Sequence, residues 1–281
     1  MITVDENRNS NISSEHSEEL LNIIENFRLM DDTFMSKVFE DKACAELLLR
    51  VILNRDDLTV VRVVSQFELK NLQGRSARLD IYAIDEHGKQ YDVEVQRSDD
   101  GAAPSRARYN SSLLDANLLN PGDKFDELPE SYIIFITEHD VLKGGKPLYT
   151  VNRTISELDH AIFTDGSHII YVNGEIRNGT ALGELMQDFF CKDPREMHYK
   201  VLSDRAGYFK KDKEGVDTMC KLVEDYGEKR ARQAAELASN ERAVRMANNL
   251  WNKGERDLQQ IADLTDLPLD EVKKLFEGKT A

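Results

Sequence analysis

The chain has 281 residues, of which 37 are basic and 52 acidic, so its formal net charge at pH 7 is −15. Hydrophobic residues make up 40% of the sequence and charged residues 32%, a balance typical of a globular protein with a charged surface. No apolar run approaches the roughly 18 residues that a membrane-spanning helix needs. The negative charge disfavours nucleic acid as a partner unless cations gather locally or a divalent ion brings the phosphate in.

The cysteines and the first residues indicate the compartment. Three cysteines, far apart in the sequence, exclude a disulfide framework and a metal knuckle. The chain begins without a basic stretch followed by an apolar one, so we expect no secretory signal. We therefore predict a cytoplasmic protein that does not bind membranes.

The N-terminal part has helical patterns. Residues 1–14 are polar, and we predict that they form a flexible arm. Apolar residues recur at mixed three- and four-residue spacing over 16–30, which predicts a short amphipathic helix. A second helix is expected over 32–53.

Strands and helices then alternate. The segments 60–69, 78–85 and 91–97 have strand patterns, and a short polar stretch joins the last two as a hairpin. Residues 103–120 return to helical spacing, and the apolar run 131–139 is typical of a strand buried on both faces.

A further strand over 168–176 and a short helix over 183–190 complete this region. The order of elements predicts the fold class α/β, with a mixed β-sheet flanked by helices.

The C-terminal part is helical. Residues 216–251 lack strong turn signals and indicate a long helix, either an exposed arm for self-association or part of an ordinary core. Residues 255–277 split at Pro268 into two short helices, similar to a helix-turn-helix. This last segment has seven acidic and three basic residues, so packing, dimerisation or partner contact is favoured over DNA reading.

The predicted hairpin carries the candidate chemistry. Alternation puts Asp80 on one face of its strand, and Glu94 and Gln96 on the matching face of the next. With the turn centred on Gly88, Tyr82 lies opposite Glu94 and Asp80 opposite Gln96, so the two carboxylates are diagonal neighbours. On spacing alone such a face is most often solvated surface, but its apolar neighbours favour a functional site.

Two carboxylates on adjacent strands suit Mg²⁺ or Mn²⁺, which keep several waters and accept phosphate oxygens. Such an ion activates water and neutralises phosphate in an in-line displacement. Gln96 could orient the water or bind the phosphate, and Glu46 could complete the metal shell if its helix packs over the hairpin. We predict Asp80, Glu94 and Gln96 as catalytic residues, and Asp80, Glu94 and Glu46 as metal ligands.

The ordered set of residues resembles the PD-(D/E)XK nuclease superfamily, in particular the branch of recombination-promoting nucleases or putative transposases. In chain order the matching residues are Glu46, Asp80, Glu94, Gln96, Arg106 and Tyr109. The segments YDVEVQRSD, RARYNSSLLDANLL and ELPESYIIFITEHDVL are similar to the branch as well. The resemblance covers roughly residues 31–200, with Gln96 in place of the usual lysine and no proline before Asp80.

The resemblance implies a restriction-endonuclease-like fold and metal-dependent cleavage of DNA phosphodiesters, associated with recombination or mobile elements. Local cations would supply the positive charge that the whole chain lacks. The expected DNA-binding residues are Arg78, Arg97, Arg106, Arg108 and Tyr109. Two alternatives stay open. The arginines form surface ion pairs with Asp85, Asp92, Asp99 and Asp100, or the chain is a catalytically inactive nuclease fold that acts as a DNA-binding or protein-interaction module.

We expect four parts in the chain: an arm and short helix over 1–30, the nuclease-like core over 31–200, a helical extension over 201–254 and a helix-turn-helix-like tail over 255–281. The C-terminal helices are also the expected surface for a homo-oligomer.

Overall fold

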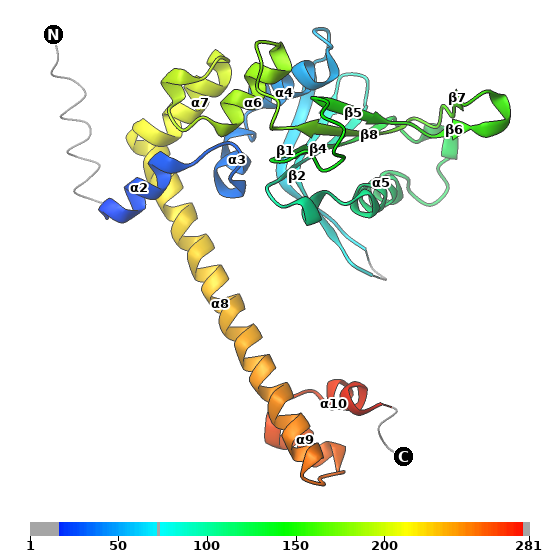
Figure 1. Ribbon diagram of the computed structural model, residues 1–281, viewed down its shortest axis with the longest axis vertical. Helices are drawn as coiled ribbons and strands as arrows, with labels where there is room; N and C mark the ends of the chain where they lie inside the picture. The colour runs from blue at the N-terminus through cyan, green and yellow to red at the C-terminus, as the bar shows by residue number, and fades with distance from the viewer. Residues whose placement is uncertain (1–16, 72–73, 278–281) are drawn as a thin grey trace. The chain divides into compact units, whose positions relative to one another are not determined.

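The computed structural model describes residues 17–71 and 74–277 and divides into two compact units, Met1–Cys220 and Lys221–Ala281 (Figure 1). The polar arm predicted over 1–14 lies outside the described residues. In the part of the chain that the structure describes, no helix is both long enough and apolar enough to cross a lipid bilayer.

The first unit begins with three helices. Helix α2 (Glu18–Asn26) starts where the Ser17 hydroxyl accepts the N–H of Leu20. The single helix predicted over 32–53 is wrong, because the structure has α3 (Asp32–Val38) and α4 (Lys42–Leu53) instead. The Asp41 carboxylate accepts the N–H groups of Ala43 and Cys44 and so starts a new helix inside the apolar pattern.

A six-stranded mixed sheet lies at the centre of this unit, in the order β1-β2-β3-β4-β8-β5. Strands β1, β2 and β3 are antiparallel, β3, β4 and β8 are parallel, and β5 is antiparallel to β8. The strands are β1 (Val60–Leu69), β2 (Ala77–Asp85), β3 (Gln90–Gln96), β4 (Ser131–Thr137), β5 (Leu148–Val151) and β8 (Ser167–Asn173). The predicted α/β class with a mixed sheet is therefore confirmed.

Helices cover both faces of this sheet. Helix α5 (Pro104–Leu118) lies on one face, and α4 and α6 (Ala181–Phe190) lie on the other (Figure 1). On the α5 face, Leu113 and Leu114 pack with a row of aromatic side chains from three strands. Strand β4 is buried on both faces of the sheet, which explains why its sequence is a nearly continuous apolar run.

The hairpin between β2 and β3 has a three-residue loop. Ile84 pairs with Gln90 and Tyr82 with Asp92, and the backbone at Gly88 has a φ of +79°. A residue in the left-handed region at the end of a three-residue loop is typical of such hairpins. The loop is thus centred one residue earlier than predicted, and the predicted pairing of Tyr82 with Glu94 is wrong by two residues.

Several elements escaped the sequence patterns. They are helix α7 (Lys200–Lys211), strand β5, and a two-stranded sheet of β6 (Thr154–Ile155) and β7 (Ala161–Ile162). Short 3-10 helices span Asp99–Ala102, Phe125–Glu127, Ser156–Leu158 and Pro194–Glu196. Helix α7 packs against α3 and α4 in the first unit.

Helix α8 (Lys213–Asn252) begins in the first unit and supplies the first helix of the second. There it packs with α9 (Leu258–Thr265) and α10 (Leu269–Phe276) around a small core. The rings of Trp251 and Phe276 stack at 4.3 Å in that core. The predicted pair of short helices around Pro268 is confirmed.

Candidate active site

Asp80 on β2 and Glu94 on β3 are neighbours across the hairpin. Ile81 pairs with Val93 in this antiparallel hairpin. Asp80, which precedes Ile81, therefore lies beside Glu94, which follows Val93. Asp80 Oδ2 accepts the backbone N–H of Val95 at 3.0 Å. The two carboxylates are therefore more directly opposed than the predicted diagonal arrangement.

Asp92 brings a third carboxylate to the same face, and the face is buried. The side chains of Asp92 and Glu94 are both fully buried, because α5 covers this side of the sheet. The solvated surface that spacing alone favoured is thus excluded. Acidic side chains are almost never fully buried unless they are paired or bind ions.

Two side chains of α5 meet these carboxylates. The Arg106 guanidinium donates to Glu94 Oε2 and, through Nη1, to the carbonyl oxygen of Gly101 at 2.8 Å. Asn110 Nδ2 donates to Asp92 Oδ2 at 3.1 Å and to Glu94 Oε1 at 3.4 Å. Arg106 and Asn110 lie four residues apart, so one face of the helix supplies both contacts.

Gln96 lies on the same face, two residues beyond Glu94. Its Nε2 donates to Glu94 Oε2 at 3.2 Å. Unlike a lysine, the neutral amide adds no positive charge to the site, so the guanidinium of Arg106 is the cation in contact with Glu94.

Burial raises the pKa of all three carboxyl groups. For Glu94 the loss of hydration is the largest cause, and the charges of Asp92 and Asp80 raise its pKa further. Loss of hydration is also the main reason that the pKa values of Asp80 and Asp92 are raised, and Arg106 lowers all three in part. The ionised carboxylates thus lack sufficient positive charge from the protein itself.

The residues present fit a divalent metal ion. Asp92 Oδ1 is buried without a hydrogen-bond partner, and the charge of Asp80 raises the pKa of Asp92 further above the increase that burial causes. No three His, Cys, Asp or Glu side chains within residues 17–71 and 74–277 are arranged to hold a metal. Magnesium needs only one or two protein carboxylates, since water and phosphate oxygens complete its shell.

The family model described as PD-(D/E)XK nuclease family transposase matches residues 37–263 of the chain. The chain belongs to this family. The resemblance inferred from the sequence is confirmed, and with it the restriction-endonuclease-like fold. The match extends beyond residue 200 through α8 and into α9. No curated protein and no solved structure matches the chain.

The structure does not bring Glu46 to the carboxylates of this PD-(D/E)XK family member, contrary to its predicted place in the metal shell. Its Oε2 accepts the N–H of Val60 at 2.9 Å, and its Oε1 pairs with Arg50 at 2.9 Å. Val60 pairs with Asp85 at the far end of β2, five residues from Asp80. Oε2 of Glu46 thus joins α4 to β1, and its Oε1 is held by an ion pair within α4.

The predicted DNA-binding residues have different surroundings. Arg97 forms ion pairs with Asp31 at 2.9 Å and with Glu138 at 3.3 Å, which are not the aspartates that the ion-pair alternative named. Arg106 contacts Glu94 directly, as described above. The side chains of Arg78 and Arg108 are exposed, and Tyr109 lies on the exposed side of α5.

Three residues near the site are not among the predicted site residues. Strand alternation puts Asp92 on the face of Glu94 and Gln96, so the pattern that selected those two residues includes it. Asn110 lies one turn after Arg106 and could have been found by helical spacing. Asp32, in the first turn of α3, is near enough for its charge to raise the pKa of Asp80, and its place depends on a contact between distant segments.

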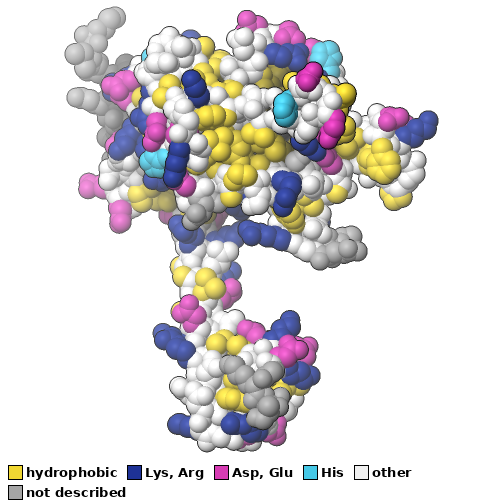
Figure 2. All heavy atoms as spheres, turned by 45° about the vertical axis from the view of Figure 1, so that its right-hand side comes forward, with side chains coloured by type: hydrophobic (Ala, Val, Ile, Leu, Met, Phe, Trp, Pro, Cys, Tyr) yellow, Lys and Arg dark blue, Asp and Glu magenta, His cyan; other side chains and the backbone are white. Residues whose placement is uncertain are grey.

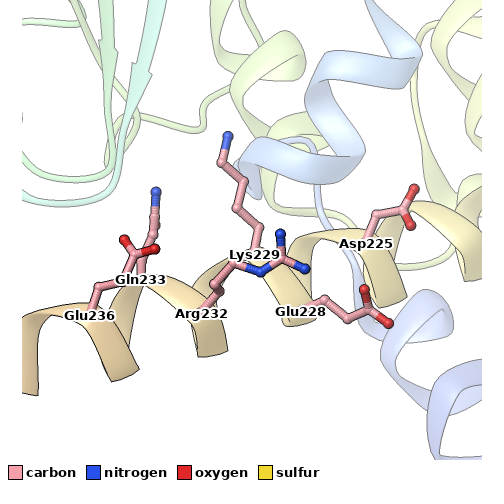
Figure 3. Close-up of a pocket in the computed structure, with 6 residues that line it drawn as sticks. All are labelled: Asp225, Glu228, Lys229, Arg232, Gln233 and Glu236. Atoms are coloured by element: carbon pink, nitrogen blue, oxygen red, sulfur yellow. The ribbon is translucent and has the colours of Figure 1, made fainter. Parts of the chain in front are cut away.

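Charges on the surface are mixed. Basic and acidic side chains alternate over the face of the first unit in Figure 2, around a broad apolar area. A hollow of about 460 Å³ on α8 is likewise lined by both signs (Figure 3). Its lining residues are Asp225, Glu228, Lys229, Arg232, Gln233 and Glu236. The spacing of opposite charges four residues apart stabilises an exposed helix, and we assign this hollow no chemistry.

Proposed function

We propose that the chain is a Mg²⁺- or Mn²⁺-dependent endonuclease that hydrolyses DNA phosphodiesters, in association with recombination or mobile elements. The single observation that supports this most is the buried cluster of Asp80, Asp92 and Glu94, which the protein compensates incompletely. Burying carboxylates that are only partly compensated costs folding free energy, which favours a function that uses the cluster.

Asp80 and Glu94 are the proposed metal ligands. A bound divalent ion would supply the charge that activates water and neutralises the scissile phosphate. Gln96 donates to Glu94, which fixes the direction of that carboxylate. The second amide hydrogen or the carbonyl oxygen of Gln96 could then position water or a phosphate oxygen.

Arg106 has two roles in this proposal. Without substrate, its guanidinium neutralises Glu94. Its side chain is 37% exposed, so it also borders the solvent from which a phosphate would approach. A guanidinium donates two parallel hydrogen bonds to phosphate, which suits Arg106 to orient the DNA backbone.

Two further proposals concern the compartment of the protein and its self-association. Cys44 and Cys191 are free thiols, which supports a reducing compartment such as the cytoplasm. Self-association through α8, α9 and α10 stays a proposal.

The test is plasmid nicking by purified protein with Mg²⁺, with Mn²⁺ and with EDTA. Asp80→Asn and Glu94→Gln keep the size of each side chain and remove its charge, so both should abolish nicking. Asp126→Asn changes an exposed carboxylate in the 3-10 helix after α5; it is the matched control and should nick as the wild type does.

Equal nicking by Glu94→Gln and the wild type would show that another site or a contaminant cuts the plasmid. A folded wild type that nicks under neither metal would favour the inactive binding module, for which Gln96 in place of lysine is the supporting observation.

A further inference from the structure

A groove of about 620 Å³ lies along α5, beside the end of β1. Tyr109, Ser112, Leu113 and Asn117 line it from α5, at the spacing of one helix face. Lys70 and Asn71 line it from the segment after β1. The sequence analysis placed Tyr109 near DNA, but the groove itself results from two segments that are far apart in the chain.

The groove begins next to the proposed active site. Tyr109 follows Arg106 by three residues on α5, a rise of about 4.5 Å along the helix axis. The guanidinium of Arg106 contacts Glu94. Tyr109 in the groove is therefore about one helical turn along α5 from the arginine that contacts Glu94.

Tyr109 is held in place at the side of this groove. Its hydroxyl donates to the carbonyl oxygen of Arg75 and accepts from Asn71 Nδ2 at 3.1 Å. Its side chain nevertheless stays 37% exposed. An aromatic ring that is both anchored and accessible is a suitable platform for a nucleobase, because every base presents a flat π-face.

The charge around the groove favours phosphate. The lining residues include Lys70 and no acidic side chain among the described residues. Arg75 contacts Tyr109 through its backbone carbonyl, and Arg108 precedes Tyr109 on α5; both arginines are exposed. Lys70 thus gives the groove a positive charge, in contrast to the net charge of −15 for the whole chain.

We propose that the groove binds unpaired nucleotides of the substrate, directly beside the phosphodiester that is cut. Tyr109 stacks on one base, and Lys70 pairs with a backbone phosphate. The volume is that of a site for a drug-sized ligand, which corresponds to about one or two nucleotides. The inference rests on the proposed nuclease function, and it narrows the substrate to DNA with a single-stranded segment at the cleavage point.

Binding without cleavage tests the groove. Fluorescence anisotropy in EDTA compares a labelled oligothymidylate with a blunt duplex of the same length. We expect the full-length protein to bind the single strand more tightly. Tyr109→Ala should weaken single-strand binding about tenfold, within the range for one stacked base, and should leave duplex binding unchanged.

Three further variants make the test specific. Tyr109→Phe keeps the ring and should keep most of the affinity, whereas Ser112→Glu puts a negative charge into the groove and should weaken single-strand binding. Tyr226→Ala on α8, where the tyrosine is 41% exposed, is the matched control and should bind as the wild type does. Ser112→Glu also covers the case in which Tyr109→Ala fails to fold.

Equal affinity for single strand and duplex, or no loss in Tyr109→Ala and Ser112→Glu, would overturn the groove proposal. Cleavage assays with Mn²⁺ separate this failure from that of the nuclease function. Metal-dependent cutting of duplex that Tyr109→Ala retains would leave the nuclease and remove the groove. If single-strand binding depends on Tyr109 but neither the wild type nor any variant cleaves DNA, the groove proposal stands and the nuclease proposal fails.

Discussion

Arg106 and Glu94 form an ion pair between a half-buried guanidinium on α5 and a fully buried carboxylate on β3. The pair joins the helix to the sheet at the point where the proposed metal ion would bind. In the metal-free protein, Arg106 therefore supplies part of the positive charge that the proposed metal ion would bring. Arg106 and the metal ion would compete for the carboxylate of Glu94.

Arg106→Ala removes that competitor. The metal-free variant should lose about 1–3 kcal/mol of unfolding free energy, because Glu94 is left without its charged partner. Its affinity for Mn²⁺ should rise, while nicking should fall through the loss of the phosphate contact. Calorimetric titration and urea unfolding measure the first two effects. Arg108→Ala, two residues away and exposed, is the control, and a lower Mn²⁺ affinity in Arg106→Ala would contradict the competition.

Asp92→Asn should stabilise the metal-free protein. The amide oxygen can accept from Asn110, and the amide nitrogen takes the position of the unpartnered Oδ1 beside Glu94. Since the pKa of Asp92 is raised, the folded carboxyl is protonated at about pH 5, where the substitution should change little. At about pH 8 we expect a gain of about 1–3 kcal/mol in urea unfolding. A loss of stability at pH 8 would show that the carboxylate is better accommodated than its contacts indicate.

The stability of the metal-free protein should fall as pH rises. The pKa values of Asp80, Asp92 and Glu94 are all raised by folding, so the folded state binds more protons than the unfolded chain above about pH 4. Divalent ions compete with protons for the same oxygens. The thermal shift caused by Mn²⁺ should therefore grow between about pH 5.5 and about pH 8, and a shift independent of pH would place the ion elsewhere.

Glu46→Gln separates a structural role from a metal-binding one. Loss of the ion pair with Arg50 and a weaker bond to the Val60 N–H should cost about 1 kcal/mol of stability. The thermal shift with Mn²⁺ should be that of the wild type. If the variant keeps its fold but loses this shift, Glu46 is a metal ligand as the sequence predicted, and its contacts in the metal-free structure change on binding.

Phe276→Ala tests the independence of the second unit. Trp251 is the sole tryptophan of the chain and stacks on Phe276, so its fluorescence reports on this unit. Removing a buried phenylalanine costs about 3–5 kcal/mol, more than a three-helix core of this size tolerates easily. The fluorescence transition should move to lower temperature while the Mn²⁺ shift of the first unit persists. Leu264→Ala, exposed on α9, is the control, and a joint loss of both signals would show that the units unfold together.

Local patterns predicted most elements of the first unit. Period-two alternation predicted β2 and β3, and helical spacing predicted α5. In these segments the apolar side chains recur with the period of the strand or helix, because one face of each element is buried. The patterns failed at Asp41, where a side-chain cap starts a helix inside an apolar run. They also failed at β5 and α7, which are short or weakly amphipathic and are stabilised by contacts with β8, α3 and α4.

The hairpin register shows the limit of such reasoning. Alternation placed Asp80 and Glu94 on one face, but their exact opposition depends on a loop of three residues that ends at Gly88. A shift of the turn by one residue changes the pairing by two, which leaves the face unchanged and alters the neighbours.

By itself, the sequence determined the family, the α/β class and the two carboxylates, because the order of motifs and the alternation of side chains are properties of the chain alone. The tertiary structure decided what surrounds them. It buried Asp92 and Glu94 under α5, brought Arg106 and Asn110 onto them, and placed Glu46 at the other end of β2. Those contacts join residues of a helix and a strand that are 12 to 18 positions apart in the sequence. Only the packing of the helix on the sheet sets the distance between the two side chains of each contact.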